Sequence, residues 1–198
     1  MGRLTGLLIL AAALGGCAAL STLHTEVSTY GQWPPGRAPG TYAFERLPSQ
    51  QARAQAQDAL EAAARPALRE AGITETPAGQ EPDVRVQVGA RLTRVDVGPW
   101  GSQFGISGYW AGSRNPWWGP GWGLGWQAEL PRYEREVGLL VRDHASGRVL
   151  YEARAGYEGS AVGDGRMLAA MFSAAMKDFP DPGVNPRAVR VPLEPAPR

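Results

Sequence analysis

The chain has 198 residues, 43% of them hydrophobic, which predicts one domain with a core of its own. Its 20 basic residues are balanced by 19 acidic ones, so no net charge steers the chain toward nucleic acid. Cys17 is the only cysteine, which excludes an internal disulfide and leaves the fold dependent on its hydrophobic core.

The N-terminal segment has the features of an export signal. Arg3 supplies a positive charge, and residues 4–14 form an apolar run of 11 residues. A membrane-spanning helix needs about 20 apolar residues, so this run is too short to cross a bilayer and fits a cleaved secretory signal. The small residues Gly15 and Gly16 then precede Cys17.

The motif Leu14-Gly15-Gly16-Cys17 resembles the lipobox of bacterial lipoproteins. The resemblance implies that residues 1–16 are removed and that Cys17 carries a covalent lipid, the only attached group we expect. Several acyl chains, at about 0.8 kcal/mol per buried CH₂, anchor a protein stably to a membrane. The residue after the cysteine is Ala18 rather than aspartate. By the usual sorting rule of Gram-negative lipoproteins, this implies the outer membrane, with the protein facing the periplasm. The alternative is an ordinary secretory signal with an incidental cysteine.

After a tether at residues 17–23, the chain predicts a domain over residues 24–179. Two extended segments are expected near 24–30 and 41–46, separated by proline-glycine turns. A helix is expected from an N-cap at Ser49 to a C-cap at Gly72, with a kink or a second start at Pro66. Its apolar face comprises Ala56, Leu60, Ala63, Ala67 and Ala71.

A strand with one solvent-exposed face is expected next. Val84, Val86, Val88, Ala90 and Leu92 alternate with polar residues and glycine. At Arg94 the apolar positions change parity, which predicts a bulge near Thr93.

A β-hairpin is expected over residues 133–157, with its turn at Ser146-Gly147. Its inward sets are Val137, Leu139 and Val141 on one strand and Val149, Tyr151, Ala153 and Ala155 on the other. Residues 166–179 predict a helix with one apolar stripe, formed by Met167, Leu168, Met171, Phe172, Ala175, Met176 and Phe179. The tail, residues 180–198, is rich in proline and predicts no regular structure.

This order of elements predicts an α+β fold with two layers, in which two helices cover one face of a mostly antiparallel sheet. A long Gly/Trp-rich loop at residues 98–131 interrupts the sheet between two strands.

The same order resembles the domain of unknown function 4136 family of bacterial envelope lipoproteins. The resemblance rests on Thr41-Tyr42-Ala43-Phe44, the alanine-rich helix ending at Gly72, Pro82-Asp83-Val84-Arg85-Val86, and the hairpin at 140–155. It covers most of residues 24–179. It implies the fold and an envelope location, and it implies no activity.

The Gly/Trp-rich loop is the candidate binding region. It holds nine glycines between positions 98 and 125 and six of the seven tryptophans. A loop of this length is uncommon in a compact domain unless it is functional or disordered. The candidate ligand or partner contacts are Trp100, Tyr109, Trp110, Trp117, Trp118, Trp122 and Trp126.

Four interpretations of this loop are open. It is a self-packed or disordered insertion, a protein-partner surface, a stacking surface for peptidoglycan or lipopolysaccharide sugars, or a membrane-interface contact. The loop has no cluster of polar residues that could bind sugar hydroxyls, which weakens the sugar interpretation. Arg114 is its only basic residue, which weakens the interpretation as a contact with an anionic membrane.

Catalytic and metal motifs are absent from the sequence. His24 and His144 have no metal-ligand spacing, and there is no nucleophile elbow or Walker loop. Asp143-His144 beside the hairpin turn is better explained as a solvated pair than as a catalytic dyad. Glu134 and Glu136, about 7 Å apart on one strand face, match a glycosidase spacing that nothing else supports. We expect a non-catalytic binding or assembly module, or else a structural lipoprotein; an enzyme acting on envelope carbohydrate is the remaining alternative.

Overall fold

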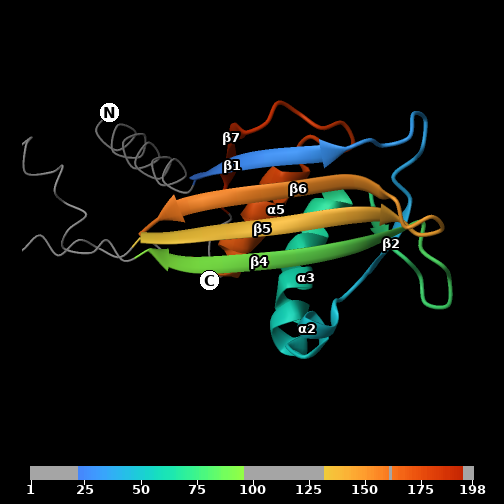
Figure 1. Ribbon diagram of the computed structural model, residues 1–198, viewed down its shortest axis with the longest axis horizontal. Coiled ribbons are helices and arrows are strands. Elements are labelled where there is room, and N and C mark those ends of the chain that lie inside the picture. Colours follow the sequence, from blue (N-terminus) through green and yellow to red (C-terminus); the bar gives the residue numbers. More distant parts are fainter. Residues whose placement is uncertain (1–21, 96–131, 161, 194–198) are drawn as a thin grey trace, which may run out of the picture.

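The computed structural model describes residues 22–95, 132–160 and 162–193 (Figure 1). It shows an α+β fold with one seven-stranded sheet in the order β3-β2-β4-β5-β6-β1-β7. The strands are β1 (Thr22–Gly31), β2 (Thr41–Phe44), β3 (Thr74–Glu75), β4 (Val84–Val95), β5 (Arg132–Asp143), β6 (Val149–Gly159) and β7 (Arg187–Pro192). The helices are α2 (Pro48–Gln51), α3 (Ala54–Glu70) and α5 (Gly165–Met176).

The sheet is mixed, and most of its ladders are antiparallel. β4, β5, β6, β1 and β7 pair antiparallel in that order, whereas β2 runs parallel to both β3 and β4. The predicted α+β class and the two early strands are therefore confirmed. The two-residue strand β3 was not predicted, because Thr74-Glu75 is too short to show any periodicity.

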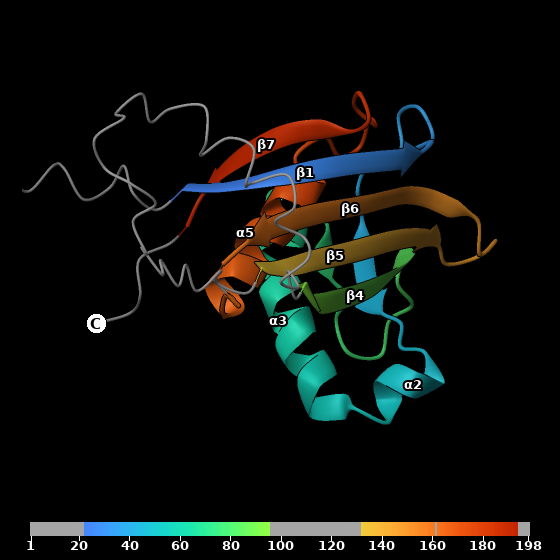
Figure 2. The ribbon, with the colours of Figure 1, turned by 60° about the vertical axis from the view of Figure 1, so that its left-hand side comes forward.

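Helices α3 and α5 lie on the same side of the sheet (Figures 1 and 2). The strand residues that face them are fully buried, as Val86, Val137 and Ala153 show. Burying a side chain such as valine or phenylalanine stabilises a fold by about 1.5–3 kcal/mol, so this interface forms most of the core. The alternation seen at Val84, Val86 and Val88 identified the covered face correctly.

Helix α5 is the better predicted of the two long helices. Asp164 caps it by accepting hydrogen bonds from the backbone N–H groups of Arg166 and Met167. Of the predicted stripe, Met167, Met171, Phe172, Ala175 and Met176 are buried. Leu168 is half-buried against the core, and the helix ends at Met176, so that Phe179 packs on the core from beyond it.

The predicted helix from an N-cap at Ser49 to Gly72, with a kink or a second start at Pro66, is wrong in two respects. The N-cap is Leu47, and the chain breaks between the short α2 and α3. α3 then passes through Pro66, whose exposed position lets the helix accommodate a missing N–H on its solvent side. The break occurs where Gln50 and Gln57 both donate side-chain hydrogen bonds to the Val88 carbonyl on the β4 edge.

The buried face of α3 also differs from the alanine face that was predicted. Leu60 and Ala67 are buried as expected, but the rest of the buried face is Gln57, Glu61, Ala64 and Leu68. Glu61 is 3% exposed. It lies 2.6 Å from Arg46 and accepts a further hydrogen bond from Gln57, so the buried charge is compensated. Hydrophobic periodicity could not place polar residues on a buried face.

The bulge predicted near Thr93 is absent, since β4 and β5 pair residue for residue from Val84 to Val95. The change of parity has another cause. Leu92 is 46% exposed, so the helices do not cover this end of the strand, and its residues need not alternate between apolar and polar. The irregularity lies between β5 and β6 at Val141/Arg142. There Leu150 is buried and Val149 is exposed, so the predicted inward position of Val149 is wrong. The other members of that set, Tyr151, Ala153 and Ala155, are buried as predicted.

The C-terminal tail was predicted to be irregular, and this prediction is wrong. Residues 187–192 form β7, which pairs with β1 along six residues, and Val189 and Val191 are buried. Before it, the Asn185 side chain accepts from the Thr29 N–H and donates to the Thr29 carbonyl. Proline is tolerated because β7 is an edge strand and Pro192 is its last residue.

We predict that β7 is required for stability. Val189→Ala or Val191→Ala should lower the free energy of unfolding by about 1–2 kcal/mol, because each removes buried methyl groups. Ending the chain at residue 182 should destabilise it further, whereas ending it at residue 193 should leave it unchanged. Urea unfolding of the four variants measures this, and equal stability of the two truncated chains would contradict the role of β7.

Candidate functional site

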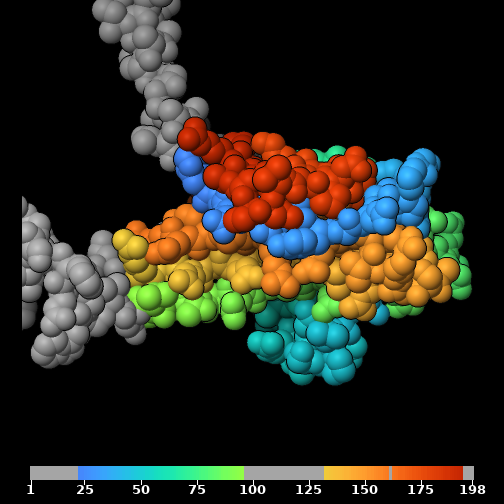
Figure 3. Space-filling view, turned by 45° about the horizontal axis from the view of Figure 1, so that its top comes forward, coloured from blue at the N-terminus to red at the C-terminus, as the bar shows by residue number. Residues whose placement is uncertain are grey.

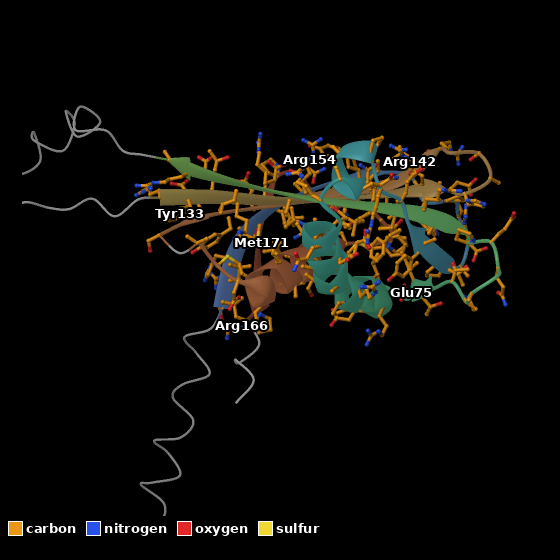
Figure 4. All side chains as sticks on the ribbon, turned by 90° about the horizontal axis from the view of Figure 1, so that it is seen from below. Glu75, Tyr133, Arg142, Arg154, Arg166 and Met171 are labelled. Atoms are coloured by element: carbon orange, nitrogen blue, oxygen red, sulfur yellow. The ribbon has the colours of Figure 1, made fainter. Side chains whose placement is uncertain are left out.

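The face of the sheet opposite α3 and α5 is the candidate site, and we call it the open face. Figure 4 shows Arg142 and Arg154 on this side, away from Met171 of α5. In the space-filling view, β4, β5 and β6 are visible between β1 and α2 (Figure 3). Its central positions are Arg91, Thr93, Gln87 and Gly89 on β4, Glu134, Glu136, Gly138, Leu140 and Arg142 on β5, Glu152, Arg154, Gly156 and Glu158 on β6, and Glu26, Ser28 and Tyr30 on β1.

Glycines form the floor of the open face. Gly89 and Gly138 are directly paired across β4 and β5, and Gly156 lies diagonally on β6. None has a positive φ. A Cβ added at Gly89 or Gly138 would meet nothing within 4 Å in the described chain. Because mid-strand glycine costs roughly 0.5–1 kcal/mol relative to alanine, the described fold gives no reason for these glycines, which often mark the close approach of a ligand or another backbone.

Two hollows lie on this floor on either side of Arg154. The first, about 500 Å³, contains Gly156 and is bordered by Glu26, Tyr30, Arg91, Glu134, Glu136 and Glu158. The second, about 400 Å³, contains Gly89 and Gly138, with Leu47, Leu140 and Arg142 at its border. The first is lined by four glutamates and three arginines, and the second combines apolar walls with two guanidinium groups and the Glu152 carboxylate.

Ion pairs across neighbouring strands and within β6 set the charges of the open face. Arg91 lies 3.3 Å from Glu136, Arg132 lies 2.8 Å from Glu158, and Arg154 lies 2.9 Å from Glu152. All are solvent-exposed pairs, which contribute little to stability. Glu26 and Glu134 make no hydrogen bond or ion pair with the described residues, and both border the first hollow.

The structure shows what surrounds Glu134 and Glu136. They share the open face as the strand pattern implied, but Glu136 is paired with Arg91 and Glu134 lies opposite Glu158. Within the described ranges no group of three or more His, Cys, Asp or Glu side chains could hold a metal ion.

Asp143 and His144 do not face each other as a dyad. Asp143 accepts hydrogen bonds from the Ser146 hydroxyl and N–H and from Arg37, and His144 Nδ1 accepts from Arg85. The bonds from Ser146, followed by those from Arg37, hold the pKa of Asp143 well below its usual range. Asp143 therefore fastens the hairpin turn to the loop before β2, and His144 contacts Arg85 at the start of β4.

The site residues named from the sequence lie outside the described ranges. These are Cys17 and the loop residues Trp100, Tyr109, Trp110, Trp117, Trp118, Trp122 and Trp126. The open-face glycines were missed, although Gly89 stands in the polar phase of the β4 alternation, where a side chain would be expected. No helix within the described residues is long and apolar enough to cross a membrane.

Sequence comparison identifies the family. Residues 26–181 match the domain of unknown function DUF4136. The chain belongs to this family. The match ends before β7, which the structure nevertheless makes part of the sheet. No curated protein matches the chain.

Solved structures are similar to the chain at low sequence identity. A PDZ domain protein from Parabacteroides distasonis is 17% identical, with a TM-score of 0.53; the match covers 91% of this chain and 42% of that one. This chain therefore spans less than half of that protein's length, and the likeness shows the fold alone. The PelC dodecamer from Paraburkholderia phytofirmans, in two crystal forms, is 14% identical with a TM-score of 0.42, covering 77% of this chain and 94% of PelC.

We predict that Gly138→Val leaves the fold intact and raises the free energy of unfolding by up to about 1 kcal/mol, because valine suits a strand and the space above Gly138 is open. Gly31→Ala is the opposite case: its φ is +125°, and the new Cβ would lie 2.4 Å from the Leu150 carbonyl oxygen. It should destabilise. Thermal unfolding of both variants measures this, and a clear loss of stability in Gly138→Val would show that the fold itself needs the glycine.

The pKa of Asp143 predicts an acid-sensitive hairpin end. Because its folded pKa is lowered, its stabilising contribution is present above the unfolded value of about 4 and is lost as the pH falls below it. Asp143→Asn should therefore be less stable than the wild type at pH 7, and the difference should shrink at pH 3. Urea unfolding at both pH values measures this. Asp181→Asn, an exposed loop carboxylate, is the control, and a constant deficit for Asp143→Asn would contradict the assignment.

Proposed function

We propose that this protein is a lipid-anchored, non-catalytic binding or assembly module of the outer membrane, and that the open face is its binding surface. The observation that carries the proposal is the set of glycines that line two hollows, on the face that α3 and α5 leave uncovered, with Leu47 before α2 at its β4 edge. A strand position without a side chain costs stability, so its use at a paired position in the sheet centre indicates contact with a binding partner.

The chemistry of the hollows suits a polar partner. Carboxylates and guanidinium groups border them, with Tyr30 and Leu140 as apolar surface. Such a surface can form hydrogen bonds to a protein or to the hydroxyl and amide groups of peptidoglycan or lipopolysaccharide. The tryptophans of residues 99–126 remain proposed contacts of the same partner, and the neutral charge balance argues against nucleic acid.

The location is supported by the N-terminal sequence. The apolar run, the lipobox-like Leu14-Gly15-Gly16-Cys17 and Ala18 together support lipidation at Cys17, export to the periplasm and sorting to the outer membrane. The domain begins with Thr22 in β1, close enough to Cys17 to be held at a membrane surface.

The binding surface is tested by affinity capture from cross-linked envelopes. The intact protein should enrich a protein or a muropeptide that Gly138→Val loses, because the valine fills the floor of the second hollow. Ala62→Val, which places the same side chain on the exposed side of α3, is the matched control and should retain it. A chain lacking residues 99–126 reports separately on the tryptophans.

If Gly138→Val captures what the intact protein captures, the open face is not the binding surface. A structural lipoprotein without a ligand is the alternative function, and it predicts identical captures for all four proteins. Loss of a wall-hydrolysis activity in Glu134→Gln would instead support an enzyme.

The anchor is tested by fractionation. Cys17→Ser removes the thiol that would carry the lipid, so this variant should leave the membrane fraction and appear in the soluble periplasm. Detection of the protein in membrane and soluble fractions measures the shift. A Cys17→Ser protein that still sediments with membranes would contradict lipid anchoring.

A further inference from the structure

A third hollow lies beside β2 at the edge of the sheet, and we call it the edge hollow. Its volume is about 460 Å³, and its border includes Tyr42 and Phe44 of β2, Arg65 of α3 and Glu75 of β3. It shares no bordering residue with the two hollows of the open face. Figure 4 shows Glu75 beside α3, away from the side on which Arg142 lies.

The outer edge of β2 loses its partner strand after Tyr42. The Thr76 N–H donates to the Tyr42 carbonyl, which is the last backbone hydrogen bond between these two segments within the described residues. Pro77 follows, and the chain turns away through a hydrogen bond from the Gln80 N–H to the Pro77 carbonyl. β3 is therefore only two residues long, and it does not reach the end of β2.

Phe44 carries the backbone groups that are left open at this edge. Its neighbour Glu45 donates its N–H to the Val86 carbonyl of β4. Because the backbone groups of successive strand residues point to opposite sides, the N–H and C=O of Phe44 point away from β4. Neither group forms a backbone hydrogen bond within the described residues. An outward donor and acceptor on one residue are the groups that an added strand satisfies.

The hydroxyl of Tyr42 is a further group without a partner. Tyr42 is 2% exposed, and its hydroxyl makes no hydrogen bond with the described residues. Glu75, Arg65 and Glu61, whose charges act on this hydroxyl, all border the edge hollow, which places the hydroxyl beside it. Burial, followed by the charge of Glu75, raises the pKa of Tyr42, so the hydroxyl stays protonated and can both donate and accept. A buried polar group without a partner costs free energy, and a ligand in the hollow supplies the missing hydrogen bond.

The charged side chains around the edge hollow are already paired with one another. Arg46 lies 2.6 Å from Glu61, and Arg65 lies 3.4 Å from Glu75. The Arg65 guanidinium also lies over the Phe44 ring, 5.4 Å from its centroid. Because these charges balance, the hollow attracts neither anions nor cations. The groups without a partner are an N–H, a C=O and a hydroxyl, which match the hydrogen-bonding groups of a peptide.

We propose that the edge hollow binds an extended peptide segment of a partner protein, which adds to the sheet beside Phe44 along the line that β3 leaves. A peptide carbonyl accepts from the Phe44 N–H, and a peptide N–H donates to the Phe44 carbonyl. The Tyr42 hydroxyl bonds a further polar group of the segment. This site depends neither on the lipid anchor nor on what the open face binds.

Titration with a defined peptide tests the site by NMR. N-acetyl-Ala-Ala-Ala-amide is added to the nitrogen-15-labelled full chain, and the backbone amide resonances are followed. The Phe44 amide resonance should move downfield with saturable dependence on peptide concentration, and its hydrogen exchange should slow. The same peptide with an N-methyl group on each alanine cannot donate to the Phe44 carbonyl, and it should leave this resonance unchanged.

Two buried tyrosines provide matched variants. Tyr42→Phe should weaken peptide binding about fivefold, the effect of losing one hydrogen bond. Tyr151→Phe is the control, because Tyr151 is equally buried but its hydroxyl donates to the Ala175 carbonyl under α5; it should bind as the wild type does.

A Phe44 resonance that the peptide does not move, or that the N-methylated peptide moves equally, overturns the proposal. Wild-type affinity in Tyr42→Phe overturns the role of the hydroxyl. The comparison of the two peptides needs no substitution, so it decides the question even where a variant fails to fold.

Discussion

The alternation of side chains along β4, β5 and β6 is the constraint on which the rest of the structure depends. Successive residues of a strand point to opposite faces, so a strand that places Val84, Val86 and Val88 under the helices must place Arg85, Gln87 and Gly89 on the other side. Two long helices cover only one face. The other face must then be solvated or must bind a partner.

Two buried polar side chains of α3, Gln57 and Glu61, fasten one element to another. Gln50 and Gln57 bond the otherwise open Val88 carbonyl on the β4 edge, and Glu61 holds Arg46 in the segment that leads to α2. The two glutamine contacts lie on either side of the break between α2 and α3. They also account for the absence of a long β2, because side chains take over the edge of β4 where β2 ends.

The sequence was informative wherever packing follows hydrophobic periodicity. The α+β class, the main strands, the hairpin and helix α5 all follow from apolar spacing, and the turn glycine Gly147 has the expected positive φ. Periodicity failed at Gln57 and Glu61, where buried polar residues are satisfied by partners distant in sequence. It failed again at Leu150, where a single inserted residue moved Val149 to the surface, and at β7, whose two buried valines stand among prolines.

The candidate site, like the fold, was predicted from the sequence only in part. Sequence reasoning selected the tryptophans because their composition is unusual, whereas the open face depends on which glycines become neighbours. Gly89, Gly138 and Gly156 are far apart in the chain and adjoin only once the register of three strands is fixed. The sequence did show a glycine, Gly89, at a position of β4 where the alternation calls for a polar residue. This indicates a binding surface only once its cross-strand partner, Gly138, is also known to be glycine.

Site-specific photo-crosslinking in living cells tests the central claim that the open face is the binding surface. A benzoylphenylalanine in place of Gln87 lies on the open face beside Gly89, and one in place of Arg69 lies on the exposed surface of α3. The account predicts a discrete adduct after irradiation at position 87 and none at position 69. An adduct at position 69 alone, or no adduct at either position, would contradict it.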